Sequence, residues 1–388
     1  MDIQLTPALL SGSVTVPPSK SQSHRLLIGA ALAGEGCYIR NLAQSEDLDA
    51  TWRCLSALFS PVDSPLLDCG ESGSTLRFLL PLSLVLRGGA RFTGHGRLLE
   101  RPLGPYESIF QEQGVDFRRL DGKIEVTGNL APGLYTLPGN VSSQFVTGLL
   151  LALPLLWGNS EIRLTTPLES ESYVEMTLSV LRRFRVEVRW LPDHSGLFIP
   201  GNQHYTPAQA AAEGDWSQAA FWYAANFLDS ALQIDGLDFG SAQGDRQVIS
   251  FSNQLAQNGD TELVLSDCPD LVPPLAVMAA VRSGTACFSG IGRLRLKESD
   301  RIESTAAMVR ALGGQVETLP DALIFHGVPV LSGGTVDGAG DHRIVMAAAI
   351  AATGCTGPVT ITGAQAVNKS YPTFFEEYQR LGGMLRVL

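Results

Sequence analysis

The stretch Pro17-Pro-Ser-Lys-Ser-Gln-Ser-His-Arg25 reads as a short polar loop that runs directly into the apolar segment Leu26–Leu32. The two prolines hold its start extended, and one of its serines can cap a helix. Backbone N–H groups at a helix start favour an anion, and Lys20 and Arg25 add positive charge. The stretch alone fits either a capped helix with incidental charges or an anion-binding loop.

Repetition of this pattern favours the anion-binding interpretation. Five more polar loops run into Ala- and Leu-rich segments. They lie at 70–77, 139–145, 214–218, 269–274 and 340–343, so successive starts, counted from residue 18, are 52, 69, 75, 55 and 71 residues apart. The loose spacing indicates a structural repeat and not a strict sequence repeat.

A second, more amphipathic helix is predicted after each apolar one. These second helices are expected at 46–58, 104–114, 171–184, 245–259, 297–314 and 371–383, with short β-like runs at 90–94, 123–128, 185–191 and 261–266. We therefore predict an α/β fold of six copies of one unit, each with a buried first helix and a surface-facing second helix.

The composition limits the possible functions. The chain has 388 residues, 45% of them hydrophobic, a formal net charge of −11 and a pI near 5.1. This acidity argues against nucleic acid or an anionic membrane as a partner, although a local cationic pocket remains compatible with it. Six cysteines without CxxC spacing, and no signal-peptide pattern at the N-terminus, lead us to expect free thiols and a cytoplasmic protein.

Six units divide most naturally into two lobes of three. A turn-rich stretch at 200–207 marks a possible boundary. We expect an N-terminal lobe at 19–213 and a discontinuous C-terminal lobe made of 1–18 and 214–388. The two crossings would then act as a hinge.

The segment RLRLKESDR (293–301) carries four cations in nine residues of an acidic protein. We expect it to open a helix, with Lys297 and Arg301 at i and i+4 on one face. A solvated face laced with ion pairs is the alternative. His342 and Arg343 similarly stand at a predicted helix start.

Asp270 follows a proline and precedes an apolar helix, so a helix cap is the simplest role for it. No histidine pair has zinc-ligand spacing, and neither a GxGxxG nor a GxxxxGK[ST] motif is present. The residues therefore favour neither a metal site nor a nucleotide site.

Seven motifs together resemble one family across nearly the whole chain. In order, PPSKSQSHR, ESGSTLR, GRLLERP, VSSQF, LKESDR, GDHR and NKSYP resemble the EPSP synthase family. The resemblance implies two lobes, each of three βαβαββ units around a pseudo-threefold axis. It also implies transfer of the enolpyruvyl group of phosphoenolpyruvate to the 5-hydroxyl of shikimate 3-phosphate, through a tetrahedral adduct, with release of phosphate. Neither a cofactor nor a metal is implied, and we expect a monomer.

The resemblance also implies roles for individual residues. For shikimate 3-phosphate it implies Lys20, Ser21, Arg25, Ser142, Ser143, Gln144, Ser170, Tyr173, Asp270 and Lys297. For phosphoenolpyruvate it implies Lys20, Gly73, Arg97, Gln144, Arg301, His342, Arg343 and Lys369. For catalysis it implies Asp270 as base and Glu298 as the proton-transfer group at the methylene carbon. It also implies Lys20, as a lysine that meets both substrates, and Lys369, as the lysine that closes the phosphoenolpyruvate pocket.

Three positions depart from the family pattern. Glu71 and Arg293 stand where many members carry asparagine, and Phe78 stands where proline is frequent. A carboxylate at 71 costs affinity for an anion unless a cation such as Arg77 pairs with it.

Two other functions remain open from sequence. One is enolpyruvyl transfer to UDP-N-acetylglucosamine by a sibling enzyme of the same fold, although no cysteine lies between Cys69 and Cys268 to match that enzyme's reactive cysteine. The other is a non-catalytic module that binds phosphorylated metabolites. Retention of Lys20, Asp270, Glu298 and Lys369 together argues against such a module.

Overall fold

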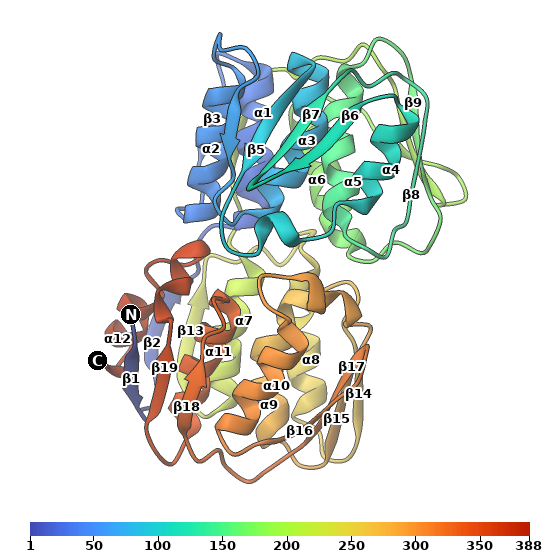
Figure 1. Cartoon of the computed structure of the whole chain (residues 1–388). Coiled ribbons are helices and arrows are strands. Elements are labelled where there is room, and N and C mark those ends of the chain that lie inside the picture. Colours follow the sequence, from blue (N-terminus) through green and yellow to red (C-terminus); the bar gives the residue numbers. More distant parts are fainter. The chain divides into compact units, whose positions relative to one another are not determined.

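The computed structural model of the chain describes residues 1–388. The chain forms two compact units, and only one of them is continuous in sequence (Figure 1). The continuous unit is Ser19–Ala212, and the discontinuous unit joins Met1–Pro18 to Glu213–Leu388. No helix is both long and apolar enough to cross a lipid bilayer.

The continuous unit alternates helices and short strands. Its helices are α1 (Lys20–Ala33), α2 (Glu46–Leu58), α3 (Gly73–Arg87), α4 (Gly104–Glu112), α5 (Ser143–Ala152) and α6 (Glu171–Arg183), with 3-10 turns η1 (Leu98–Glu100) and η2 (Leu153–Leu155). Its strands are β3 (Tyr38–Arg40), β4 (Leu66–Asp68), β5 (Gly89–Thr93), β6 (Asp116–Leu120), β7 (Lys123–Thr127), β8 (Leu134–Leu137), β9 (Ser160–Leu164), β10 (Arg189–Trp190), β11 (Gly196–Ile199) and β12 (Gln209–Ala211).

The discontinuous unit repeats this alternation. Its helices are α7 (Trp216–Phe227), α8 (Val248–Leu255), α9 (Val272–Val281), α10 (Arg301–Ala311), α11 (His342–Ala351) and α12 (Phe374–Arg380), with 3-10 turns η3 (Gly244–Gln247), η4 (Pro269–Leu271), η5 (Gly292–Leu296), η6 (Ala352–Gly354) and η7 (Ala364–Lys369). Its strands are β1 (Ile3–Thr6), β2 (Ser11–Thr15), β13 (Ala231–Asp235), β14 (Thr261–Val264), β15 (Thr285–Ser289), β16 (Gln315–Thr318), β17 (Ala322–His326), β18 (Gly334–Asp337), β19 (Val359–Thr362) and β20 (Met384–Val387).

Each unit has three sheets, and four of the six sheets share one topology. The orders are β4-β5-β7-β6 and β8-β9-β11-β10 in the continuous unit, and β14-β15-β17-β16 and β18-β19-β1-β20 in the other. In each, the first pair is parallel and the next two pairs are antiparallel. The remaining sheets, β3 with β12 and β2 with β13, are parallel pairs. The predicted α/β fold of repeated units is confirmed.

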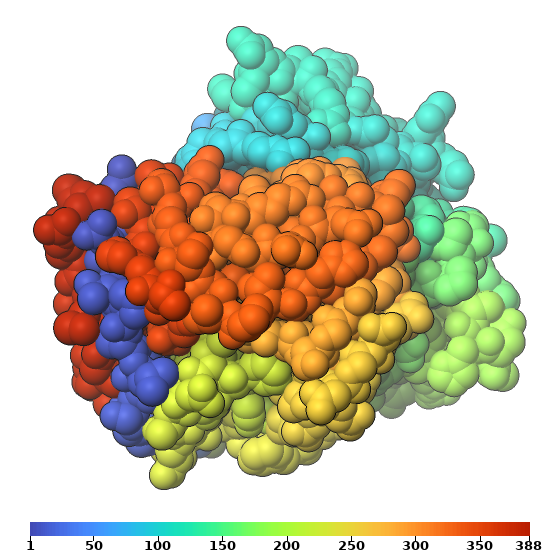
Figure 2. All heavy atoms as spheres, turned by 90° about the horizontal axis from the view of Figure 1, so that it is seen from below, coloured from blue at the N-terminus to red at the C-terminus, as the bar shows by residue number.

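Both chain ends lie in one sheet of the discontinuous unit. Strand β1 pairs antiparallel with β19 on one side and with β20 on the other, with Ile3 opposite Ile361 and Val387. The two termini therefore lie side by side on the surface (Figure 2). In this sheet, β1 takes the third position, which β17 takes in the sheet β14-β15-β17-β16.

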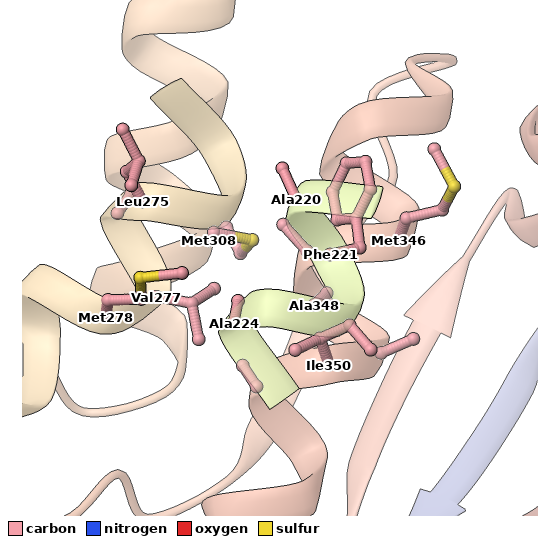
Figure 3. Close-up of a cluster of buried hydrophobic side chains, with 14 of the residues drawn as sticks. Ala220, Phe221, Ala224, Leu275, Val277, Met278, Met308, Met346, Ala348 and Ile350 are labelled. Atoms are coloured by element: carbon pink, nitrogen blue, oxygen red, sulfur yellow. The ribbon is translucent and has the colours of Figure 1, made fainter. Parts of the chain in front are cut away.

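The first helix of each repeat is buried, as the apolar runs predict. All ten residues of α11 are buried, and α11 packs between α7 and α9. Figure 3 shows Phe221 of α7, Leu275 of α9 and Ile350 of α11 in one cluster. Each such large apolar side chain contributes about 1.5–3 kcal/mol when removed from water. This burial anchors the helix starts, which carry the polar residues.

Five of the six buried helices begin with a side-chain cap. Ser19, Ser72, Ser142, Asp215 and Asp341 accept from backbone N–H groups of the first turn. The sixth, α9, has prolines at 273 and 274, which carry no N–H to be capped.

Four local expectations are wrong. The segment from Lys20 to Arg25 is the first turns of α1, not a loop, because Ser19 caps the helix ahead of it. Helix α10 begins at Arg301, capped by Asp300, and not near 297. Lys297 follows η5 in an extended conformation, so it does not share a helix face with Arg301. Only Arg189–Trp190 of the run 185–191 forms a strand.

Candidate active site

Polar side chains gather at the starts of the buried helices in each unit. We call the group in the continuous unit the N-terminal cluster (Lys20, Ser21, Arg25, Gly73, Arg77, Arg101, Ser142, Ser143, Gln144, Ser170 and Tyr173). We call the group in the discontinuous unit the C-terminal cluster (Asp270, Lys297, Glu298, Arg301, Asp341, His342, Arg343 and Lys369). Each is described within its own unit.

Arg25 ties three helices of the N-terminal cluster together through neutral partners. It donates from Nε to Thr177 Oγ1 (2.8 Å), and from Nη2 to Thr147 Oγ1 (3.2 Å) and the Tyr173 carbonyl (3.2 Å). It also donates from Nη1 to the Ser21 carbonyl (2.6 Å). Burial lowers the pKa of Arg25 to about 10, so it remains a cation at neutral pH. None of these partners cancels its charge.

The departure at Phe78 is explained by this arginine. The Arg25 guanidinium carbon lies 5.1 Å from the centre of the buried Phe78 ring, a cation–π contact that a proline could not make. The neighbouring His24 is fully buried and hydrogen-bonded through Nδ1 to Thr51 Oγ1 (2.7 Å). Burial, with Lys20 and Arg25, lowers the pKa of His24 well below its ordinary value, so the ring is neutral.

Lys20 points from α1 towards α2. Its Nζ lies 2.7 Å from Asp47 Oδ2, with both side chains mostly buried. Asp47 was not among the sequence-predicted residues, because nothing in the local pattern indicates which acid a helix-start lysine will meet.

Two buried arginines approach Gly73 at the start of α3. A Cβ placed on Gly73 would lie 2.6 Å from Arg101 Nη1 and 2.8 Å from Arg77 Nη1, so a methyl group there would have to displace the ends of both arginine side chains. Arg77 Nη1 also donates to Gln144 Oε1 (2.9 Å), and Gln144 Nε2 donates to Ser74 Oγ (3.0 Å). The starts of α3 and α5 therefore share one network of donors.

Arg97 differs from the other predicted residues of this unit. It precedes η1 and is exposed, whereas Arg101, four residues later, is buried beside Gly73. Sequence reasoning missed Arg101. The carboxylate of Glu71 lies beside His95, with Oε1 3.4 Å from Nδ1.

Ser170 stands at the start of α6 in a strained conformation. It is 2% exposed and has φ +57°, in the left-handed region that non-glycine residues rarely adopt. Such strain persists where the surrounding fold enforces it, commonly at functional sites. Ser142 caps α5, and Ser143, its first residue, is buried.

Asp270 bridges two arginines in the C-terminal cluster. Its Oδ1 accepts from Arg301 Nη1 (3.0 Å), and its Oδ2 accepts from Arg343 Nη2 (2.8 Å). Lys297 Nζ lies 3.8 Å from Oδ1. Asp270 belongs to η4 and makes no cap, so the helix-cap interpretation is wrong.

Arg301 is held by three carboxylates. Besides Asp270, it donates from Nη2 to Glu298 Oε2 (2.6 Å) and from Nε to Asp341 Oδ2 (2.9 Å). Arg301 is 1% exposed and Asp341 is fully buried. Despite the opposing effect of burial, Asp341, Glu298 and Asp270 raise the pKa of Arg301 above its ordinary value.

Asp341 joins this cation to the start of α11. It caps α11 by accepting a hydrogen bond from the Arg343 N–H (3.0 Å), and it accepts another from the Ser299 hydroxyl (3.0 Å). Arg343 Nη2 donates in addition to Ser217 Oγ (3.0 Å), at the start of α7. The starts of α7 and α11, with η4, thereby meet at one point.

The remaining predicted residues of this cluster are Lys369, His342 and Lys297. Lys369, the last residue of η7, donates from Nζ to the Gly340 carbonyl (2.8 Å) just before α11. His342, the first residue of α11, is buried. Burial lowers the pKa of Lys297 to about 8, against the opposing effect of Asp270, so it is mostly a cation at neutral pH.

The chain is similar in sequence to a known family of proteins. A family model described as EPSP synthase (3-phosphoshikimate 1-carboxyvinyltransferase) matches residues 5–378. Relatives named 3-phosphoshikimate 1-carboxyvinyltransferase include one from Clostridium acetobutylicum, 38% identical over 98% of this chain and 97% of its own length. Another, from Clostridium kluyveri, is 40% identical over the same shares.

Solved structures support the fold. EPSP synthase from Acinetobacter baumannii superposes with a TM-score of 0.80 at 22% identity, over 100% of both chains. The enolpyruvyl transferase NikO from Streptomyces tendae gives 0.81 at 17% identity, over 99% of this chain and 98% of its own. At such low identities the likeness shows the architecture alone, and it confirms the predicted enolpyruvyl-transferase fold.

Proposed function

Because the chain belongs to the EPSP synthase family, we propose that its two clusters serve one reaction on two anionic substrates. The chain transfers the enolpyruvyl group of phosphoenolpyruvate to the 5-hydroxyl of shikimate 3-phosphate and releases phosphate, a step of the shikimate pathway. The cations of both clusters suit phosphates and carboxylates.

The N-terminal cluster binds the phosphate of shikimate 3-phosphate in this proposal. Arg25, with its positive charge unopposed by a carboxylate among its hydrogen-bond partners, supports that role. The hydroxyls of Ser21, Ser142, Ser143 and Ser170, and the side chains of Gln144 and Tyr173, would complete the binding. Lys20 would contact both substrates.

The phosphate of phosphoenolpyruvate would bind at the start of α3. Gly73, Arg77 and Arg101 support this assignment, because two guanidiniums approach a helix start that has no side chain in the way. Arg97, whose side chain is exposed, would join them in binding phosphoenolpyruvate.

The carboxylate of phosphoenolpyruvate would bind to the arginine pair of the C-terminal cluster. Arg301 and Arg343 together present donors spaced for one carboxylate, since they already hold both oxygens of Asp270. Lys369 and His342 lie beside the start of the same helix.

The chemistry needs one base and one acid. Asp270 would accept the proton of the 5-hydroxyl while that oxygen bonds to C2 of phosphoenolpyruvate. Glu298 would deliver a proton to C3, which forms the tetrahedral adduct. Loss of a C3 proton and of phosphate, through C–O cleavage, then restores the double bond. Lys297 and Lys20 would stabilise the developing negative charges.

The single observation that carries the proposal is the group of Asp270, Glu298 and the buried Arg301, in which both carboxylates, the potential base and the potential acid, are hydrogen-bonded to the carboxylate-binding cation. The test is phosphate release from phosphoenolpyruvate with either shikimate 3-phosphate or UDP-N-acetylglucosamine as acceptor. We expect release with the first only. Release with UDP-N-acetylglucosamine alone would indicate the sibling activity, and release with neither would indicate a binding module.

A further inference from the structure

The two arginines assigned to the substrate carboxylate are already bound to a carboxylate. Asp270 presents one oxygen to Arg301 (3.0 Å) and the other to Arg343 (2.8 Å). This is the arrangement that a substrate carboxylate would make with the same pair. Asp270 and a bound carboxylate would therefore compete for the same donors.

Other contacts hold both arginines in place, so Asp270 is the residue of this group whose side chain can move. Arg301 also donates a hydrogen bond to Asp341, and Arg343 also donates one to Ser217. Both guanidiniums are at least 95% buried, whereas the side chain of Asp270 is 15% exposed. Turning Arg301 away would leave the buried Asp341 carboxylate without its ion-pair partner, at a high cost.

We propose that Asp270 occupies the carboxylate site of the resting protein, and that the carboxylate of phosphoenolpyruvate displaces it from Arg301 and Arg343 and so makes it a competent base. This inference rests on the proposed function and adds to it a cause for the timing of proton removal. Asp270 takes the proton of the acceptor hydroxyl only when the group that will receive the oxygen is in place.

The electrostatics of the group agree with this order. Burial acts to raise the pKa of Asp270, but Arg343, Lys297 and Arg301 outweigh it and lower that pKa, while Glu298 acts weakly in the raising direction. A carboxylate in that state is a poor base. When an anion shares the cations, their effect on Asp270 weakens and burial remains, so its pKa rises. Premature proton removal is thereby disfavoured.

The direct test compares phosphoenolpyruvate binding by wild type and Asp270→Asn in calorimetry without acceptor. Removing the competing carboxylate should tighten binding at least about tenfold. Glu303→Gln is the matched control, because it removes the same charge at an exposed ion pair with Arg295, and should change the affinity less than about twofold. Inorganic phosphate, which lacks the carboxylate, should bind wild type and Asp270→Asn with the same affinity. Equal or weaker phosphoenolpyruvate binding by folded Asp270→Asn overturns the proposal.

A second measurement needs no variant. In buffers of different ionisation enthalpy at pH 5, wild type should take up more protons on binding phosphoenolpyruvate than on binding inorganic phosphate, because only the former raises the pKa of Asp270. Equal uptake overturns the proposal even if Asp270→Asn does not fold. Failure of the proposed function is a separate result, since it would appear as wild type that releases no phosphate with shikimate 3-phosphate.

Discussion

Arg25 and Arg301 are both buried cations, yet they are held in opposite ways. The hydrogen bonds of Arg25 go to threonine hydroxyls and backbone carbonyls, and its pKa is lowered by burial. Those of Arg301 go to three carboxylates, which raise its pKa. The charge of an arginine with neutral partners is not neutralised by the protein and can attract an anionic ligand. An arginine with acidic partners binds an anionic ligand only when that ligand displaces one of the carboxylates. We infer that the first suits tight phosphate binding and the second suits a carboxylate site that must be switched.

The largest difference between the two arginines should be in stability. Arg301→Ala leaves Asp341 and Glu298 without their buried partner, and we expect a loss of about 3–5 kcal/mol in the free energy of unfolding. Arg25→Ala leaves only hydroxyls and carbonyls, and should cost about 1–3 kcal/mol. Urea denaturation measures both. Equal losses would remove the distinction between the two sites.

Glu298→Gln separates catalysis from binding within the C-terminal cluster. The amide keeps an oxygen for Arg301 but cannot deliver a proton, so we expect kcat to fall about 100- to 10,000-fold. Binding of shikimate 3-phosphate, measured by calorimetry, should be nearly unchanged. Glu303→Gln, a surface control on the next helix, should keep full activity. Normal turnover by Glu298→Gln would refute the acid role.

Arg25→Gln tests the phosphate role of the N-terminal cluster. Loss of a charged donor to phosphate should raise the KM for shikimate 3-phosphate about 10- to 100-fold. Arg87→Gln is the control, because this exposed arginine also donates to carbonyls, those of Ser60 and Val62. If the two variants behave alike in steady-state kinetics, Arg25 does not bind the substrate.

Gly73→Ala tests the space at the start of α3. The added methyl must push aside Arg101 and Arg77, and we expect the KM for phosphoenolpyruvate to rise about tenfold, within what small misplacements of binding groups can cost. Gly104→Ala is the matched control, because a Cβ there meets nothing within 4 Å. An unchanged KM in Gly73→Ala would place the phosphate elsewhere.

The smallest expected effect is on the pH dependence of stability. The folded-state pKa of Asp270 is depressed, so its contribution to stability is present above the unfolded-state pKa of about 3.9 and is lost as the pH falls below it. The difference in unfolding free energy between wild type and Asp270→Asn should therefore be constant from pH 7 to 5 and shrink below about pH 4. Urea titrations at several pH values measure it. A difference that grows in acid would contradict the sign.

Much of the fold follows from local sequence signals. Apolar runs behind Ser or Asp caps predict the buried helices, and the helix expected at 46–58 is α2. The start of α10 was also readable, since Asp300 and Glu303 have capping-box spacing. We instead predicted that the helix begins at residue 297, because we expected the charged run at 293–301 to open it.

The contacts within the clusters could not be predicted in this way. Asp270 meets partners 31 and 73 residues away, and no helical or strand period links such positions. Three arginines (77, 97 and 101) stood near Gly73 in sequence, and only the packing of η1 and α3 decides that Arg101 is buried there. The resemblance supplied the residues proposed for catalysis, and the structure added Asp341 and Arg101.

The division of labour between the two clusters can be measured directly with Arg25→Gln and Arg343→Gln, by determining the KM of both substrates for each. We predict a crossed pattern: Arg25→Gln raises mainly the KM for shikimate 3-phosphate, and Arg343→Gln raises mainly that for phosphoenolpyruvate. Variants that raise the same KM, or both constants equally, would contradict the account.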